Sequence, residues 1–488
     1  MTPNSSILYQ NRDATVFLID IPASIALAQE LSPQSSSDAV SGHTSISAHA
    51  SSGVRTNRRH LLSSPPLKTP YPPSSEPKTA AAREKVLERI PRSERDFAKV
   101  IEPLVSDALS EIRIQCRPAS DWCLPRCSIE ESSEGTKHEG GISTDGTGAR
   151  LGKRRREESL RAYDQERQLI YEDFDVHITE QVSNIAMQPP LILSPGLNSF
   201  EVKGELCNIS VRNTSPEIAT VEIRSLDPTD EPSCDAEKQG RSPRFIIPPL
   251  SNFLLCNLPI STPPTGPRNA NPIPGLPREQ NFNLILLDPP WSNRSVRRSG
   301  HYHTQSYLDS GRLTKYICEI LRVYSYLPMG KDATLEATNT PNYSIAAVWV
   351  TNSAKSRKTA HDSLMGAGFS ISEEWVWIKT TTDGEPVAPI GGLWRKPYEA
   401  LVIGKKYPAS GAPATGILRR IIAAVPDIHS RKPNLREVFE RVFFSSHSGT
   451  GVLKYSALEV FARNLTAGWW ACGNEVLKFN SERWWAEG

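Results

Sequence analysis

The sequence predicts an α/β fold with a mostly parallel sheet for residues 282–480. Apolar runs of strand length recur through this part of the chain, at 284–287, 345–350, 374–378, 400–403, 421–425 and 457–461. Patterns of helix length lie between several of these runs, at 306–327, 355–366 and 433–444. Strands that alternate with helices indicate βαβ units, in which helices cover both faces of a mostly parallel sheet.

The pattern at 433–444 is the clearest of the predicted helices. Its apolar residues follow the i, i+3, i+4, i+7, i+8 spacing of a helix with one buried face, namely Leu435, Val438, Phe439, Val442 and Phe443. Pro433 suits the first turn, because the backbone N–H that proline lacks has no partner within the helix there. We therefore expect this helix to start at Pro433.

Residues 1–127 divide into three segments of different composition. A short apolar segment at 1–30 could form strands despite its terminal position. Residues 31–80 consist mostly of Ser, Pro, Thr and other small polar residues. They bury too little apolar surface to offset the entropy of ordering, so we expect disorder. Residues 81–127 are expected to be a helical region, because apolar residues recur there near helical spacing.

Two further segments lead to the predicted α/β domain. Residues 128–160 are a linker that contains the basic run Lys-Arg-Arg-Arg at 153–156. Residues 161–260 are an accessory segment in which short apolar runs alternate with turns, which indicates β-structure. The α/β domain then occupies 261–480, and a strand that leads into it starts at about 244. The N-terminal half is thus expected to be partly disordered, with helical and β-rich segments.

Charge and composition exclude several classes of protein. The 488 residues include 56 basic and 54 acidic side chains, a formal net charge of +2. This balance excludes a histone-like polycation, so any binding of nucleic acid must use a local basic patch. No apolar run approaches the roughly 18–20 residues that cross a bilayer, and the N-terminus lacks the basic start and apolar core of a signal peptide. We expect a soluble, intracellular protein without a membrane partner.

The four adjacent cations at 153–156 can be interpreted in two ways. They match a nuclear import signal or a patch that contacts phosphates. The alternative is a solvated helix end whose cations pair with Glu157 and Glu158. The expected location is therefore the nucleus, with the cytoplasm as a second location.

The cysteines do not predict a disulfide scaffold. There are eight, and without a secretory signal we expect them to be thiols. One cluster contains Cys116, Cys123 and Cys127, with His138 farther along. Structural zinc sites usually show two close cysteine pairs, and one pair here fits loosely. Ordinary thiols are favoured and zinc stays open, while no tight set of His, Asp and Glu predicts another metal site.

The predicted strand at 284–287 ends in Asp288-Pro289-Pro290-Trp291. Ligands of open α/β sheets bind beyond the carboxyl ends of the strands, which is where these residues stand. The two prolines remove two backbone donors. What remains is a rim of acceptors, the Asp288 carboxylate and the neighbouring carbonyls, beside the flat face of Trp291. The alternative is a proline-rich turn that caps the strand, with Trp291 merely packed.

Such a rim suits an exocyclic amino group on a flat base. The N6 lone pair of adenine is delocalised into the ring, which makes N6 a poor nucleophile. Two acceptors for its N–H bonds favour a pyramidal nitrogen and free the lone pair for attack, while Trp291 could stack on the base. The candidate catalytic residues are therefore Asp288, Pro289, Pro290 and Trp291.

These four residues begin a series of motifs that resembles the adenine-N6 methyltransferase family typified by the catalytic subunit of the messenger-RNA adenosine methyltransferase. Within that family the chain looks most like the methyltransferase-like protein four branch, over about 244–480. The further landmarks are Ser295-Val296-Arg297-Arg298, Trp349-Val350-Thr351-Asn352, Trp377-Ile378-Lys379-Thr380, Gly391-Gly392-Leu393-Trp394, His429-Ser430-Arg431-Lys432-Pro433, Glu459-Val460-Phe461-Ala462-Arg463-Asn464 and Gly473-Asn474-Glu475.

The resemblance implies a Rossmann-like, class I S-adenosylmethionine-dependent methyltransferase fold, with S-adenosyl-L-methionine as the methyl donor. Lys432 would hold the carboxylate of the donor, together with N–H groups at the start of the 433–444 helix. Arg463 and Asn464 would contact its ribose hydroxyls. By spacing alone, Lys432 could equally be a solvent-exposed lysine.

The resemblance implies three more cofactor contacts. Asn474 and Glu475 match residues of the family that touch the donor. Asn257 stands where relatives often carry an Asp that touches the adenine of the donor. Either Asn464 or Asn474 taken alone would more often be a loop-capping residue.

The substrate polynucleotide is expected to cross the same face. Between Arg294 and Lys331, basic residues are interleaved with His and Tyr. Cations for phosphates and rings for bases are the composition of a single-strand or flipped-base site. The alternative is a mobile polar loop and a solvated helix face. The candidate substrate-binding residues are Asn293, Arg294, Arg297, Arg298, Tyr302 and Trp394.

Three functions remain open at this point. The first is N6-adenine methylation of RNA, for which the resemblance implies a 2′-O-methyladenosine in small nuclear RNA. The second is the same reaction on DNA, since no residue distinguishes the two sugars. The third is a noncatalytic subunit that binds nucleic acid. A monomer and a heterodimer are both compatible with the sequence.

Overall fold

The computed structural model describes residues 4–31, 59–72, 76–77, 79–116, 122–128, 188–225, 242–260, 271–291, 310–326, 340–393, 396–407, 416–428, 430–446 and 451–487. The basic run at 153–156 lies outside these ranges.

Twelve of the described strands form one sheet, in the order β1-β2-β15-β13-β14-β12-β11-β16-β17-β10-β7-β5. The seven strands of the C-terminal part are β11 (Leu284–Leu287), β12 (Ser344–Val350), β13 (Ser370–Lys379), β14 (Tyr398–Lys406), β15 (Leu418–Ala424), β16 (Ala457–Val460) and β17 (Trp470–Gly473). The other five are β1 (Ile7–Gln10), β2 (Val16–Ile19), β5 (Leu191–Leu193), β7 (Ser210–Asn213) and β10 (Asn252–Leu255).

The sheet is mixed but mainly parallel. Seven of its strand pairs are parallel and four are antiparallel. Strand β14 runs against both of its neighbours, β12 and β13. The described part of its connection to β13 contains no helix, and a connection without a crossover helix suits an antiparallel pair. The predicted α/β fold is confirmed.

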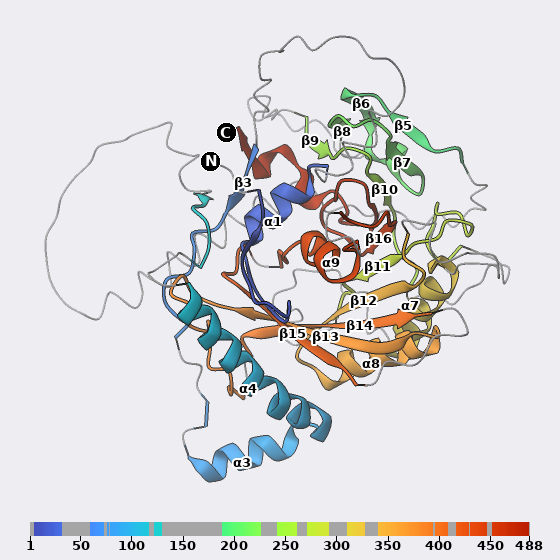
Figure 1. Ribbon diagram of the computed structural model, residues 1–488. Coiled ribbons are helices and arrows are strands. Elements are labelled where there is room, and N and C mark those ends of the chain that lie inside the picture. Colours follow the sequence, from blue (N-terminus) through green and yellow to red (C-terminus); the bar gives the residue numbers. More distant parts are fainter. Residues whose placement is uncertain are drawn as a thin grey trace, which may run out of the picture.

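Helices cover both faces of this sheet (Figure 1). On one face, α7 (Ser310–Tyr324) and α8 (Ala354–Gly366) pack on Ile285 and Leu287 of β11. On the other face, α9 (Arg436–Phe443) and α1 (Ile21–Ala28) pack on Leu284 and Leu286. Alternate residues of β11 point to opposite faces, so a strand covered on both sides is apolar throughout.

Helix α9 starts later than predicted. Its first residue is Arg436 and its N-cap is Leu435, so Pro433 precedes the helix instead of opening it. Asn434 Oδ1 accepts a hydrogen bond from the backbone N–H of Arg436, which gives the chain a turn ahead of the helix. As a result the residues from Ser430 to Leu435 form a loop at the edge of the sheet.

The N-terminal segment joins the main sheet. Strand β2 pairs in parallel with β15, and β1 pairs with β2. The prediction of disorder over 31–80 is wrong at β3 (Arg59–Ser63), which pairs with β18 (Trp485–Glu487) and with β4 (Cys127–Ser128). Leu61 and Leu62 of β3 are buried. Their strand partners lie far away in the sequence, so local composition did not reveal this pairing.

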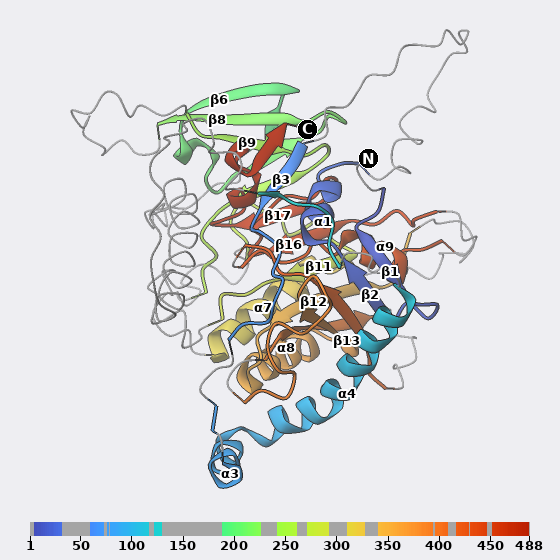
Figure 2. The ribbon, with the colours of Figure 1, turned by 90° about the vertical axis from the view of Figure 1, so that its left-hand side faces the viewer.

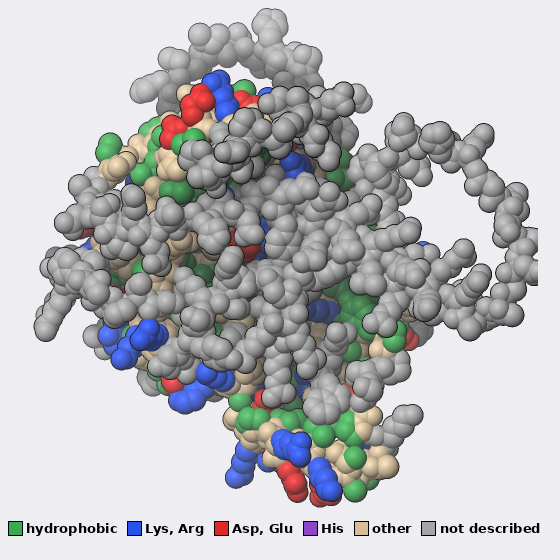
Figure 3. Space-filling view, turned by 180° about the vertical axis from the view of Figure 1, so that it is seen from behind, with side chains coloured by type: hydrophobic (Ala, Val, Ile, Leu, Met, Phe, Trp, Pro, Cys, Tyr) green, Lys and Arg blue, Asp and Glu red, His purple; other side chains and the backbone are tan. Residues whose placement is uncertain are grey.

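Two helices occupy the region predicted to be helical. Helix α4 (Arg92–Gln115) buries Ile101, Val105 and Ile112 against β2, β13 and β15. Helix α3 (Ala80–Arg89) has no buried residue and projects from the body of the protein (Figure 2). From behind, apolar and charged side chains lie together on this projecting part (Figure 3). None of the described helices is long and apolar enough to cross a membrane.

The accessory segment divides between two sheets. Strands β6 (Gly196–Val202), β8 (Ala219–Ser225) and β9 (Arg244–Ile247) form a separate sheet, whereas β5, β7 and β10 extend the main one. The strand predicted to lead into the domain from about 244 is thus two strands, of which β10 enters the main sheet. Short 3₁₀ helices complete the described elements at Lys203–Leu206, Lys478–Asn480 and Glu482–Trp484.

Candidate active site

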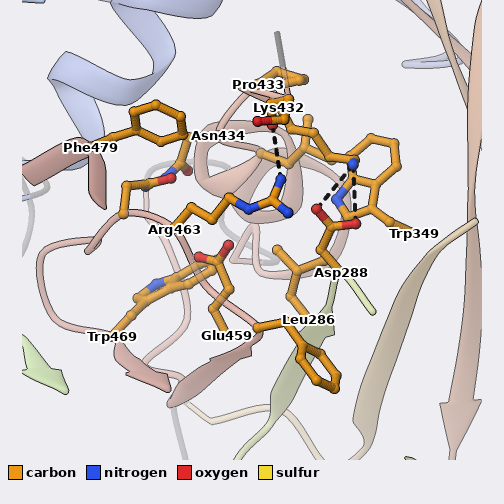
Figure 4. Close-up of a pocket in the computed structure, with 14 residues that line it drawn as sticks. Leu286, Asp288, Trp349, Lys432, Pro433, Asn434, Glu459, Arg463, Trp469 and Phe479 are labelled. Carbon is orange, nitrogen blue, oxygen red and sulfur yellow. Dashed lines mark hydrogen bonds and ion pairs between the residues drawn. The ribbon is translucent and has the colours of Figure 1, made fainter. Parts of the chain in front are cut away.

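A pocket opens at the carboxyl ends of β11 and β16, which pair in parallel (Figure 4). Its wall includes residues at the ends of these two strands and residues of the loop from Ser430 to Leu435, and Trp349, Trp469 and Phe479 complete it. Two of its residues, Ser430 and Phe461, have positive φ angles of 70° and 61°. Backbone held in this region costs energy in residues other than glycine, and such residues cluster at functional sites.

Asp288 is the residue of its tetrapeptide that lines the pocket. Its backbone N–H donates to the carbonyl of Val460 at 3.2 Å, which ties it to the end of β16. The indole Nε1 of Trp291 donates to the carbonyl of Trp349 at 2.8 Å, and the half-buried Trp291 ring packs toward the α7 and α8 core. These bonds place the Asp288 carboxylate at the pocket and hold Trp291 against the protein.

Lys432 forms an ion pair with the Asp288 carboxylate. Its Nζ is 3.0 Å from both carboxylate oxygens and 3.4 Å from Oε2 of Glu399. Dashed lines in Figure 4 mark the two contacts with Asp288. Burial disfavours the ammonium charge, but the two carboxylates outweigh it and raise the pKa of Lys432. The prediction that Lys432 stands at a helix start is wrong, because α9 begins four residues later.

Glu399 was not predicted from the sequence. It lies near the start of β14, where Oε1 is 2.6 Å from Nζ of Lys379. Burial opposes its ionisation, yet Lys432 and Lys379 lower the pKa of Glu399 to about 2. A row of alternating charges therefore runs from Asp288 through Lys432 and Glu399 to Lys379. The sequence could have pointed to Glu399, because it is an acidic residue within an apolar strand, and a buried charge is usually paired.

Glu459 is a second carboxylate in the pocket. It lies on β16 opposite Leu286 of β11, and in Figure 4 it stands below Arg463. Burial, and then repulsion by Asp288, raise the pKa of Glu459 from 4.5 to about 8. Near neutral pH this group is therefore mostly a neutral acid, which can donate a hydrogen bond as well as accept one.

Arg463 and Asn464 follow β16, as the sequence predicts for this end of the sheet. Arg463 Nε is 2.9 Å from Oε2 of Glu475, whose other oxygen is 2.7 Å from Nζ of Lys478. Arg463 also donates to the carbonyl of Ser430 at 3.4 Å. Asn464 lines the pocket, and its buried Nδ2 has no hydrogen-bond partner among the described residues.

The domain that carries this pocket can be compared with known proteins. Residues 282–475 match the MT-A70 family model. These residues form an MT-A70 domain. The family has the class I S-adenosylmethionine-dependent methyltransferase fold, which agrees with the large mixed sheet and its helices and confirms the fold that the resemblance implied.

The chain is similar to several named methyltransferases. It is 40% identical over 209 residues to the N6-methyladenosine RNA methyltransferase MTA1 of Cryphonectria parasitica, covering 42% of this chain and 55% of that protein. It is 32% identical over 246 residues to the N(6)-adenine-specific methyltransferase METTL4 of Homo sapiens, covering 48% and 44%. A DNA N6-methyl methyltransferase of Caenorhabditis elegans is 25% identical over 210 residues, covering 41% and 47%. The chain spans about half the length of these relatives.

MT-A70 methyltransferases use S-adenosylmethionine as methyl donor, and the polar groups of this pocket can be tested against that molecule. Asn464 Nδ2 is a buried donor without a partner in the described part of the chain, so a ligand oxygen in the pocket would satisfy it. Gly473 has a φ of 146°, and a Cβ atom there would lie 3.3 Å from Cα of Phe461. The backbones that end β16 and β17 thus approach closely. Of these two features, the Asn464 donor is the one that fits a hydroxyl oxygen of a bound ligand.

Other predicted residues stand beside the pocket or outside the described ranges. Asn257 follows β10 and Asn474 follows β17, at the same edge of the sheet. Glu475 acts here as the partner of Arg463. All six candidate substrate-binding residues lie outside the described residues: Asn293, Arg294, Arg297, Arg298, Tyr302 and Trp394.

The cysteine cluster does not come together as a metal site in the described residues. Among them, no three His, Cys, Asp or Glu side chains are grouped so that they could hold a metal ion. Cys123 is buried, whereas Cys116 and Cys127 are half-buried. His138 lies outside the described ranges.

The raised pKa of Glu459 predicts a pH-dependent stability. The native protein holds this proton up to about pH 8, whereas the unfolded chain releases it near pH 4.5. The contribution of Glu459 to the free energy of unfolding is therefore complete below about pH 4.5 and is lost as the pH rises toward 8. We expect the free energy of unfolding of the wild type to fall more steeply than that of Glu459→Gln between about pH 5 and about pH 8.5. Urea denaturation at both pH values measures this difference.

Glu88→Gln is the matched control, because Glu88 is an exposed carboxyl on α3. It should keep the pH dependence of the wild type. Equal slopes for the wild type and Glu459→Gln would show that Glu459 ionises normally in the native protein.

Proposed function

We propose that this chain is an S-adenosylmethionine-dependent N6-adenine methyltransferase that acts on RNA. The observation that carries the proposal is the position of Asp288, which the carbonyl of Val460 and the ammonium of Lys432 hold at the pocket of an MT-A70 domain. The names of the relatives support adenine N6 as the methylated atom.

The described residues suit an in-line displacement. When bound, S-adenosylmethionine supplies an electrophilic methyl group on a sulfonium ion. The Asp288 carboxylate accepts a hydrogen bond from N6 of the adenine, which turns the nitrogen lone pair toward that methyl group. Lys432 contacts both oxygens of Asp288 and so fixes the orientation of this carboxylate. After methyl transfer the proton on N6 leaves through Asp288 or to water, so positioning and electrostatics account for most of the rate.

Asn464 and Arg463 would hold the hydroxyl groups of the donor. Asn464 Nδ2 is buried and has no acceptor among the described residues, so it can donate to the ligand. Arg463 is held in place by its ion pair with Glu475. Asn257 and Asn474 would extend the contacts along the ends of β10 and β17. The proposal follows the resemblance in naming 2′-O-methyladenosine of a small nuclear RNA as the target and the nucleus as the location.

A methyl-transfer assay with the full chain tests the proposal. Three oligonucleotides of one sequence carry adenosine, 2′-O-methyladenosine or deoxyadenosine at the same position, and mass spectrometry identifies the methylated nucleoside. We expect N6-methylation, fastest on 2′-O-methyladenosine. Product from the deoxyadenosine oligonucleotide alone would make the chain a DNA methyltransferase. Failure on all three, with the donor bound in calorimetry, would make it a noncatalytic binding subunit.

A further inference from the structure

The loop between β13 and β14 lies beside the row of charges that ends at Asp288. It runs from Thr380 to Pro397, longer than the roughly 12–15 residues beyond which a loop usually has a function. Lys379, the last residue of β13, and Glu399, at the start of β14, form the ion pair at its base. We call the described residues of this connection, 380–393 and 396–397, the β13–β14 loop.

The strand order places this loop and the residues proposed to hold the donor on opposite sides of Asp288. Strands β13 and β14 lie on one side of β12 and β11, whereas β16, β17 and β10 lie on the other. Arg463 and Asn464 follow β16, so the groups proposed to hold the donor belong to the second side. The β13–β14 loop stands on the first side, where a substrate base must approach if N6 is to meet Asp288.

Residues from the N-terminal part of the chain hold the loop along its length. The backbone N–H of Thr382 donates to the carbonyl of Leu67 at 2.9 Å, and that of Tyr71 donates to the carbonyl of Val387 at 2.9 Å. The ring of Trp122 covers Gly384 so closely that a Cβ atom there would lie 2.2 Å from it. The first half of the loop is therefore built against these segments.

Two carboxylates secure the second half of the loop. Oε1 of Glu76 accepts a hydrogen bond from the backbone N–H of Leu393 at 2.6 Å. Oε1 of Glu102, on α4, is 2.5 Å from Nζ of Lys396. Lys396 is 17% exposed and Glu102 is 30% exposed, so water screens this pair less than a pair on the open surface. Both contacts flank residues 394–395.

Ordering a loop of this length costs conformational entropy. Because these contacts order the loop before the substrate binds, less entropy is lost when it binds. Helix α4 is fixed by Ile101, Val105 and Ile112, which are fully buried. Glu102 follows Ile101 directly, so its carboxylate is presented from a rigid element. The loop end near Lys396 therefore has a fixed support.

We propose that Glu102 is a positioning residue for the polynucleotide. Through its ion pair with Lys396, it holds the β13–β14 loop in the position in which the loop contacts the nucleotides around the target adenine. This inference rests on the proposed function and adds a role for the N-terminal part of the chain. It requires that loss of the pair weakens use of the oligonucleotide and leaves binding of the donor unchanged.

A charge exchange tests the proposal in the full chain. Glu102→Lys and Lys396→Glu each place like charges together, and the double variant restores an ion pair of reversed polarity. For each single variant we expect KM for the oligonucleotide to rise about five- to tenfold, a change of a size that a partly buried pair can produce. The double variant should return within about twofold of the wild type. Calorimetry should give the same donor affinity for all four proteins.

Asp107→Lys is the matched control, because Asp107 is exposed on the same helix and the change of charge has the same sign. It should leave KM near the wild-type value. The proposal is overturned if Asp107→Lys and Glu102→Lys change KM alike, if the double variant stays as weak as the single ones, or if donor affinity falls together with KM.

Two further measurements deal with a destabilised Glu102→Lys variant and with a wild type that is inactive. If Glu102→Lys lowers the melting temperature, Glu102→Gln removes the pair without repulsion and should raise KM about two- to threefold; an unchanged KM would overturn the proposal. If the wild type itself transfers no methyl group, the proposed function fails. Oligonucleotide binding by the same variants, followed by fluorescence anisotropy, then shows whether Glu102 and Lys396 still act as a pair.

Discussion

Asp288→Ala is expected to reduce methyl transfer by about 10²–10³-fold, the loss usually seen when one electrostatic group aimed at a reacting atom is removed. The variant loses the acceptor for the adenine N6–H. The fold should survive, because the backbone bond from Asp288 to Val460 does not involve the side chain and Lys432 keeps Glu399 as a partner. Single-turnover kinetics with bound donor measure the effect.

Asp362→Ala provides the control for this experiment. Asp362 is on α8, where it pairs with Lys358 in an exposed ion pair. Its loss should change neither the rate nor the melting temperature appreciably, since such pairs contribute about 0–1 kcal/mol. A wild-type rate for Asp288→Ala would remove Asp288 from the mechanism.

Lys432→Met is expected to lower kcat by about 10²-fold, as when a reacting group loses its alignment. The variant leaves the carboxylates of Asp288 and Glu399 without the ammonium between them. The carboxylate of Asp288 then loses the contact that orients both of its oxygens. Rates and donor affinity, measured separately, show which function of Lys432 is lost.

This experiment distinguishes two roles for Lys432. If Lys432 fixes Asp288, kcat falls and donor affinity changes little. If it holds the carboxylate of the donor, as the resemblance implies, donor affinity falls strongly and kcat at saturation stays close to the wild type. Lys358→Met on α8 removes an exposed lysine of the same length and should leave both quantities unchanged.

Local sequence was a good guide where one short segment carries the whole signal. The run Leu284–Leu287 followed by Asp288-Pro289-Pro290-Trp291 predicted a buried strand with an acidic residue at its carboxyl end, and the structure has both. The same reasoning placed Arg463 and Asn464 after β16. Such predictions succeed because burial on both faces and the direction of the chain are properties of the segment itself.

Predictions failed where the partner of a residue lies far along the chain. The spacing of 433–444 predicted a helix but not its start, so Lys432 was assigned to a helix terminus that the structure puts at Arg436. Strand β3 was hidden in a segment of disordered composition, because β18 and β4 complete its pairing. Glu399 lies 111 positions from Asp288 in the numbering, and only the strand order brings the two onto one lysine.

The sequence by itself thus determined six of the seven strands of the α/β domain, missing β17, together with the tetrapeptide at the end of β11 and the family to which its motifs point. Tertiary structure alone decided that Lys432 lies between Asp288 and Glu399, that Glu459 shares the pocket, and that Glu102 reaches the β13–β14 loop. The physical reason is that periodicity and turn chemistry act over a few residues, whereas the charge state and orientation of a side chain depend on groups that other strands and helices bring within a few ångströms.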